Sequence, residues 1–250
     1  MSYAAINAKL CAMNARLLKP HDLQTINQME SQDIAEWPNQ SLTCLRQSIT
    51  DASAHICRFI TNKTERQYIA AVATGAFIEE KLHYYITQWK NLSRLNKTNR
   101  VALRGILGAE IDLNNILWMY RLKRYHRIKG DSTYGYLVPV RYRLTHETTQ
   151  RMANCASPKA LLDEVAKSPY ASDFANLKMK DLDHGTLIGL QSEPTPEQTL
   201  AKLIDRRYQT AARQYPNSLA PAMAYLHKKQ MEIQTIIAAL SQAIRTVARR

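Results

Sequence analysis

The chain has 250 residues, which is long enough for a sizeable hydrophobic core in one or two domains. Its 34 Lys and Arg outnumber its 21 Asp and Glu, and the net charge of +13 predicts an anionic neighbour such as nucleic acid, a phospholipid surface or an acidic protein. Only 7 glycines occur and helix formers such as Ala, Leu, Gln, Lys and Arg dominate, so the composition argues against a sheet-rich fold and predicts the all-α class.

Apolar periodicity predicts a series of helices along the first half of the chain. A break is expected at Trp37, because the residue before a proline is pushed out of the helical region. The polar turn at residues 96–99 is short, so the helices on either side of it are expected to be antiparallel neighbours. The helices expected in this half cover residues 3–18, 41–61, 65–91 and 100–128.

The second half begins with a loop at residues 130–135. Either Thr145, or Ser157 with Pro158 at the first helical position, starts the next helix, which we place at residues 157–166. Residues 172–190 have the least periodicity. Two further helices are expected at residues 196–215 and 219–249, each with a proline in its first turn.

The helix expected at residues 100–128 carries a polar stripe inside an apolar pattern. Glu110, Asn114, Leu117 and Arg121 follow one another at helical spacing and therefore share one face. Glu110 and Arg121 are too far apart on that face to touch each other, so each needs a partner on another element. This arrangement favours polar pairing between helices over catalysis, because a general acid needs a second titrating group within hydrogen-bond reach.

Motifs that carry chemistry are missing from the sequence. No HExxH segment, Gly-rich phosphate-binding loop or CxxC pair occurs, and Cys11, Cys44, Cys57 and Cys155 have no zinc-finger spacing to histidine. We therefore expect no catalytic site, no cofactor and no bound metal. No segment is apolar over the length of a membrane span, so contact with a membrane is expected to be peripheral.

A dense basic run follows the polar stripe and contains Lys123, Arg124 and Arg127. One interpretation is the solvated end of a helix, where basic residues complement the negative pole of the helix dipole. The other interpretation is a docking surface for an anionic partner, for which we single out these three residues.

Residues 107–121 read Leu-Gly-Ala-Glu-Ile-Asp-Leu-Asn-Asn-Ile-Leu-Trp-Met-Tyr-Arg. This segment resembles the signature of the V-type ATPase and ATP synthase central-stalk subunit that is called C in prokaryotes and d in eukaryotes. The resemblance extends, in the same order, to the opening helix from Tyr3, to residues 134–144 around Pro139, and to the closing segment at residues 220–233.

The resemblance implies an all-helical funnel or socket, built as one unit from packed long helices, on the cytoplasmic face of a membrane. A subunit of this kind has no catalytic site. It joins the rotating shaft to the membrane proteolipid ring and passes torque between ATP hydrolysis or synthesis and ion movement. The rival interpretation is a basic helical protein that binds nucleic acid, although the resemblance implies no nucleic-acid partner.

Residues 110–116 match residues 230–236 in their order of acidic or amide and apolar positions. The match predicts internal pseudo-repeats at approximately residues 1–130 and 131–250. It also extends the expected structural polar hub to the closing helix. The polar hub, as we use the name below, consists of Glu110, Asn114, Asn115, Arg121, Tyr225, Lys229 and Glu232.

Overall fold

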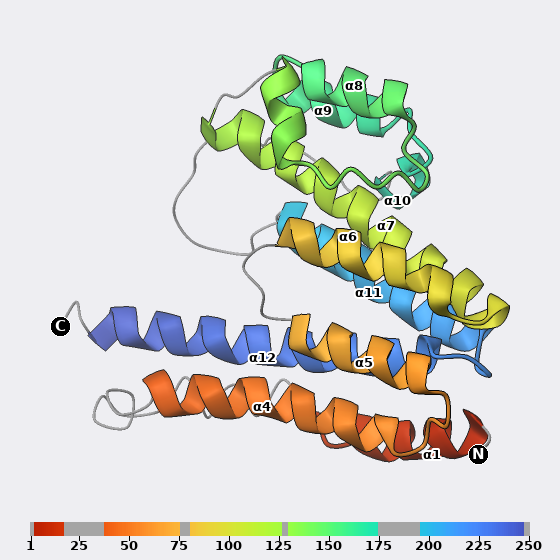
Figure 1. The fold of residues 1–250 in the computed structure, drawn as a ribbon. Helices are drawn as coiled ribbons and strands as arrows, with labels where there is room; N and C mark the ends of the chain where they lie inside the picture. The colour runs from red at the N-terminus through yellow and green to blue at the C-terminus, as the bar shows by residue number, and fades with distance from the viewer. Residues whose placement is uncertain (1–2, 18–37, 76–80, 127–129, 175–195, 248–250) are drawn as a thin grey trace. The chain divides into compact units, whose positions relative to one another are not determined.

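The computed structural model describes residues 3–17, 38–75, 81–126, 130–174 and 196–247, and every regular element in these ranges is helical (Figure 1). The all-α class predicted from composition is confirmed. Contacts between Cα atoms group the chain into two compact units. Unit 1 comprises Met1–Glu79, Ser93–Ala102 and Tyr208–Arg250, and unit 2 comprises Glu80–Leu92 and Leu103–Arg207. These boundaries differ from those of the internal repeats, which stay a prediction.

Unit 1 is built mainly from helices at the two ends of the chain. Helix α4 packs against α5 and α12, and α12 also packs against α1. Ile6, Ile49, Ile56, Ile69 and Ile233 are buried in its core. Its helices are α1 (Tyr3–Asn14), α4 (Pro38–Cys57), α5 (Lys63–Gly75) and α12 (Ala220–Val247), with the start of α7 (Lys97–Arg121) up to Ala102 and the end of α11 (Pro196–Gln214) from Tyr208.

Short polar residues begin several helices of unit 1. The Asn62 carboxamide oxygen accepts from the backbone N–H of Thr64, and the Asn96 oxygen accepts from that of Asn99, each at 2.8 Å. The Ser218 hydroxyl oxygen likewise accepts from the N–H of Ala220 at 3.0 Å. These side chains satisfy N–H groups that have no partner inside their own helix, which is why the helices begin where they do.

Unit 2 contains α6 (Lys81–Asn91), most of α7 and most of α11. Helix α8 packs against α9 and against η3, as Figure 1 also shows for α8 and α9. Leu113, Met119, Met152, Leu161 and Tyr170 are fully buried in its core. Its shorter elements are the π-helix η2 (Leu122–His126), the 3₁₀-helix η3 (Gly130–Tyr136), α8 (His146–Asn154), α9 (Pro158–Val165) and α10 (Ala171–Phe174). The short 3₁₀ turn η1 (Leu92–Arg94) passes from unit 2 into unit 1.

Most predicted helices are confirmed to within a few residues, and the differences have local causes. Both candidate starts around α8 and α9 are used, because Thr145 caps α8 and Ser157 caps α9. Helix α4 starts earlier than expected, with Pro38 in its first turn, where a missing N–H costs nothing. The helix expected at residues 65–91 is described as α5 and α6, and residues 76–80 between them lie outside the described part.

Helices α6 and α7 of unit 2 are antiparallel neighbours, as the short turn between them predicts. Tyr85 of α6 contacts Glu110 of α7, and Trp89, one turn later in α6, contacts Arg104, which precedes Glu110 in α7. From the first contact to the second, the residue on α6 lies later in the chain and the residue on α7 lies earlier, as in an antiparallel pair.

Gly108 provides the surface on which the Tyr142 side chain rests against α7. A Cβ atom built on Gly108 would come within 2.7 Å of both Cβ and Cδ2 of Tyr142, closer than real side chains approach. A Cβ atom on Gly105, one turn earlier, would lie 3.7 Å from the Tyr142 hydroxyl oxygen, an ordinary contact. The two glycines therefore face the same ring but differ in how much space they leave.

We predict that Gly108→Ala lowers the free energy of unfolding by about 1–3 kcal/mol, because Tyr142 or the α7 backbone must shift to admit the methyl group. Gly105→Ala is the matched control. It should be neutral or stabilising by up to about 1 kcal/mol, because alanine is the better helix former. Urea unfolding followed by circular dichroism measures both, and equal effects of the two substitutions would contradict this account of Gly108.

Candidate functional site

The part of the polar hub on α7 is connected to α6 through one phenol. The Tyr85 hydroxyl donates to Glu110 Oε1 at 2.9 Å and accepts from Asn114 Nδ2 at 3.0 Å. Burial raises the pKa of Tyr85 well above its ordinary value, and the negative charge of Glu110 adds to the effect. The phenol therefore remains a hydrogen-bond donor, and Glu110 and Asn114 meet at Tyr85 as helix-to-helix polar contacts.

Asn115 holds a different element, the segment that follows η3. Its Nδ2 donates to the Val138 carbonyl oxygen at 3.1 Å, and its Oδ1 accepts from the Val138 N–H at 2.9 Å. Both groups are buried, so this reciprocal pair satisfies an amide side chain and a loop backbone that would otherwise be costly to bury.

Asp112, outside the predicted polar hub, forms the densest polar contact on α7. Its Oδ2 accepts from the backbone N–H of Arg143 at 2.8 Å, from that of Leu144 at 3.1 Å and from the Tyr170 hydroxyl at 2.7 Å. Burial raises the pKa of this carboxyl above its ordinary value, although the hydrogen bonds oppose the rise. The sequence shows Asp112 beside the polar stripe, but its partners lie 31 or more residues away.

The basic run is arranged differently from the docking surface expected for it. Lys123 is buried, so the prediction that it lies on an exposed surface is wrong. Its ammonium donates to the carbonyl oxygens of Ala153 at 2.6 Å and Cys155 at 2.8 Å, where α8 ends. The α-helix gives way to the π-helix η2 at this point, and Lys123 faces α8 instead of solvent. A cation at a helix C-terminus complements the helix dipole.

Two other basic residues, Arg121 and Arg124, are less buried than Lys123. Arg121 is exposed at the end of α7. Arg124 is half-buried and donates to the Tyr120 hydroxyl at 3.0 Å. Arg127 lies outside the described residues.

The polar-hub residues of the closing helix lie in unit 1. Lys229 and Glu232 form an ion pair along α12, and the charge of Glu232 adds to the burial that raises the pKa of Tyr225. Glu232 aligns with Asp112 in the predicted repeat, yet Glu232 pairs within its own helix while Asp112 binds a loop. The polar hub is thus divided between the two units, and aligned positions have different partners.

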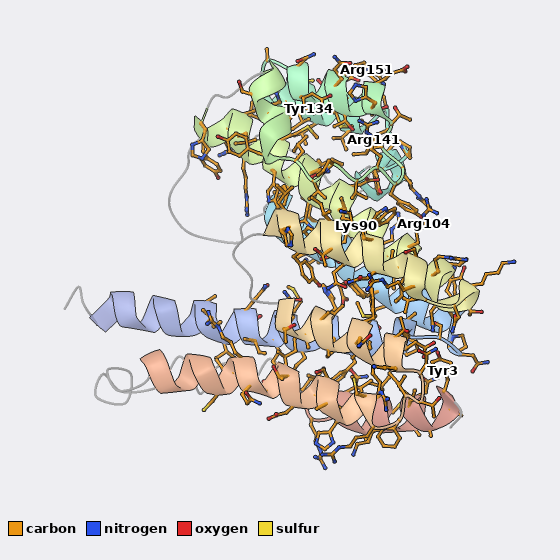
Figure 2. The ribbon with its side chains drawn as sticks, viewed as in Figure 1. Tyr3, Lys90, Arg104, Tyr134, Arg141 and Arg151 are labelled. Atoms are coloured by element: carbon orange, nitrogen blue, oxygen red, sulfur yellow. The ribbon has the colours of Figure 1, made fainter. Side chains whose placement is uncertain are left out.

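A second buried carboxylate, Glu65, was missed by the sequence reasoning. Its Oε1 accepts from Asn96 Nδ2 at 2.8 Å and from Asn99 Nδ2 at 2.7 Å, and its Oε2 accepts from the Tyr3 hydroxyl at 3.2 Å (Figure 2 labels Tyr3). Asn99 Oδ1 in turn accepts from the Leu219 N–H at 2.8 Å. Asn62 and Asn96 are sequence signals for helix starts, but no pattern shows that these starts converge on Glu65.

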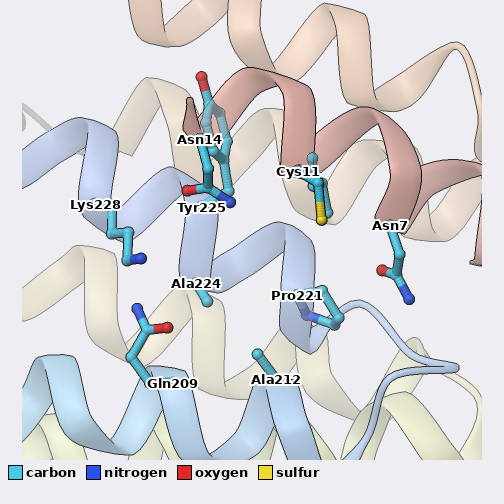
Figure 3. A pocket seen from close by; sticks show the side chains of 10 residues that line it. Asn7, Cys11, Asn14, Gln209, Ala212, Pro221, Ala224, Tyr225 and Lys228 are labelled. Carbon is cyan, nitrogen blue, oxygen red and sulfur yellow. The ribbon is translucent and has the colours of Figure 1, made fainter. Parts of the chain in front are cut away.

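Unit 1 also contains a half-open pocket of about 190 Å³ between α1, α11 and α12 (Figure 3). Its lining includes the apolar side chains of Leu10, Ala212 and Ala224 and the polar side chains of Gln209 and Lys228. Among the residues that line it, none forms the nucleophile–base pair that covalent catalysis requires. In the described ranges, no group of three or more His, Cys, Asp or Glu is placed to hold a metal ion.

The family model for the ATP synthase (C/AC39) subunit matches residues 56–245. The chain belongs to this family. The matched range includes the whole polar hub together with Glu65 and Asp112, whereas Tyr3, a partner of Glu65, precedes it. The comparison with curated proteins found no match. None of the helices described for this subunit has both the length and the apolar character of a membrane span.

Asp112 should make stability depend on pH. Its folded-state pKa is raised, so between the ordinary value of 3.8 and the higher folded value the folded state binds more protons than the unfolded state. This contribution is fully present below 3.8 and is lost as pH rises through the folded pKa. As pH rises through this window, we predict that the free energy of unfolding of wild type falls relative to that of Asp112→Asn. Urea unfolding across the window measures it, and parallel pH profiles would contradict the prediction.

The Glu65 network should contribute more to the free energy of unfolding than a surface ion pair does. Glu65→Ala removes the charged acceptor of the buried Asn99 amide, which keeps only the Tyr3 hydroxyl at 3.0 Å, and we expect it to lower the free energy of unfolding by about 1–3 kcal/mol. Glu164→Ala is the control, because that carboxylate forms ion pairs with the exposed Arg151 and Lys167 and such surface pairs contribute about 0–1 kcal/mol. Chemical denaturation of both variants tests this, and a Glu65 effect no larger than the Glu164 effect would refute it.

Proposed function

We propose that this C/AC39 subunit is a non-catalytic rotor part of the central stalk of a V-type ATPase or ATP synthase, where it joins the rotating shaft to the membrane proteolipid ring. The observation that carries the proposal is the family match over residues 56–245. Its partners are the shaft subunits and the ring, its contact with the membrane is peripheral on the cytoplasmic face, and it needs no cofactor.

The contacts within each unit suit a part that transmits force. Torque passes only through elements that resist bending, and densely packed helices with satisfied buried polar groups do so. In unit 2, α7 is tied to α6 by Tyr85, to the loop after η3 by Asn115, and to Tyr170 by Asp112. In unit 1, Glu65 connects α5 to α7. Polar contacts of this kind support a role in architecture.

The polar hub fits this role as a set of positioning residues. Removing one member of a buried polar or charged contact leaves its partner unsatisfied, at a cost of roughly 3–5 kcal/mol for a buried charge pair. Glu110, Asn114 and Asn115 therefore serve the subunit by holding the geometry of unit 2, while Tyr225, Lys229 and Glu232 hold that of α12. Arg121 is exposed at the end of α7.

The tagged full chain should co-purify with shaft and proteolipid-ring subunits from detergent-solubilised, nuclease-treated membranes. Mass spectrometry of the eluate identifies the partners, and the tag alone serves as the control. Recovery of DNA or RNA from untreated extract, with an affinity that falls steeply with salt and without ATP synthase subunits, would favour the rival nucleic-acid-binding function.

A further inference from the structure

Two arginines of unit 2 lie over a pair of aromatic rings. The Arg104 guanidinium lies 5.4 Å from the centre of the Trp89 ring, and that of Arg143 lies 5.7 Å from the centre of the Tyr142 ring. The two rings meet edge to face at 6.5 Å. Arg104, Trp89, Tyr142 and Arg143 thus form a continuous cluster across α6, α7 and the segment before α8, which we call the arginine–aromatic cluster.

Within the described ranges, neither guanidinium group of the cluster is paired with a carboxylate. Arg104 and Arg143 are exposed, and among the residues that the structure describes neither side chain makes an ion pair or a hydrogen bond. Two further basic residues of unit 2, Lys90 beside Trp89 and Arg141 near Arg143, are also exposed (Figure 2). The guanidinium groups of Arg104 and Arg143 therefore carry positive charge that no carboxylate in the described part of the chain neutralises.

The rings hold the arginines in place before any partner arrives. Tyr142 rests on Gly108, where no space remains for even a methyl group, so its ring is fixed against α7. A guanidinium that stacks on an aromatic ring keeps its N–H groups free in its own plane, where they match the two oxygens of a carboxylate. Fixing the side chains beforehand lowers the entropy cost of binding.

We propose that the arginine–aromatic cluster is a docking site for an acidic segment of a partner protein, with Arg104 and Arg143 each binding a carboxylate. This deepens the proposed function by naming the chemistry of one partner surface, and it rests on that function only for the identity of the complex. We propose this cluster as the docking site in place of the one expected around Lys123, because the Lys123 ammonium is buried against α8.

The geometry favours carboxylates of a protein over bases or lipids. Single-stranded nucleic acid binds by stacking bases on open aromatic faces, but here the guanidinium groups cover a face of Trp89 and of Tyr142. Attraction to an anionic membrane is diffuse and is served by flexible lysine-rich runs. Two guanidinium groups that lie over neighbouring rings are better suited to discrete carboxylates.

Binding of a fluorescently labelled peptide of ten glutamates to the full chain, followed by anisotropy at low salt, tests the site. Arg104→Gln/Arg143→Gln should weaken binding by about tenfold or more, because bidentate charge-assisted bonds are lost. Lys159→Gln/Lys202→Gln, which removes the same charge from exposed lysines on α9 and α11, should leave it nearly unchanged. Equal losses in the two variants would overturn the proposal in favour of net charge alone.

A charge-preserving variant separates recognition geometry from electrostatics. Arg104→Lys/Arg143→Lys should bind less tightly than wild type, since lysine keeps the charge but loses the planar fork. Wild-type affinity in this variant would overturn the proposal. So would a ten-residue oligothymidylate or phosphatidylserine vesicles that bind more tightly than the peptide through the same arginines. Thermal unfolding of each variant checks that folding is intact.

The same variants distinguish this inference from the proposed function. If wild type and Arg104→Gln/Arg143→Gln recover the ATP synthase subunits equally well, the rotor function stands and the docking site is refuted. If neither recovers them but peptide binding still depends on the two arginines, the docking site stands and the rotor function fails. Loss of a co-purifying subunit in the glutamine variant alone, with retention in the lysine-to-glutamine control, supports both.

Discussion

A buried carboxylate must be given hydrogen bonds or it destabilises the fold by several kcal/mol, and each unit of this protein is arranged around one. Glu65 in unit 1 and Asp112 in unit 2 are almost completely buried, and the donors that satisfy them are neutral amides, phenols and backbone N–H groups. A hydrogen bond requires its donor at a particular distance and angle. Each carboxylate therefore specifies where several separate segments must meet.

In unit 1 the carboxylate lies where helices begin. Glu65 stands in the first turn of α5, and its partners Asn96 and Asn99 stand at the start of α7. The Leu219 N–H, just before α12, bonds to Asn99. Helix N-termini carry a partial positive charge, so their approach to a carboxylate replaces a conventional salt bridge. In unit 2 the same task falls to a loop, since Asp112 accepts from consecutive backbone N–H groups at Arg143 and Leu144.

Local chemistry made most of the fold predictable. Apolar periodicity and capping residues such as Ser157 depend on neighbours a few positions away, and the corresponding helices were placed well. The antiparallel arrangement of α6 and α7 followed from the length of the turn between them. The environment of Lys123 did not follow, because it depends on a π-turn and on the distant end of α8. The carboxylate networks were hidden for the same reason: the polar stripe showed that partners are needed, but not which ones.

Unit 1 is built from segments that lie far apart in the sequence, which affects how it folds during synthesis. The bond between Asn99 and the Leu219 N–H spans 120 positions, and the helices that open the chain share their unit with the one that closes it. On the ribosome α1, α4 and α5 emerge before unit 2, while their neighbour α12 emerges only after it. Unit 2, by contrast, is encoded wholly between α5 and α12. Until α12 has been synthesised, the apolar faces of α1 and α4 that it covers stay open to non-native association.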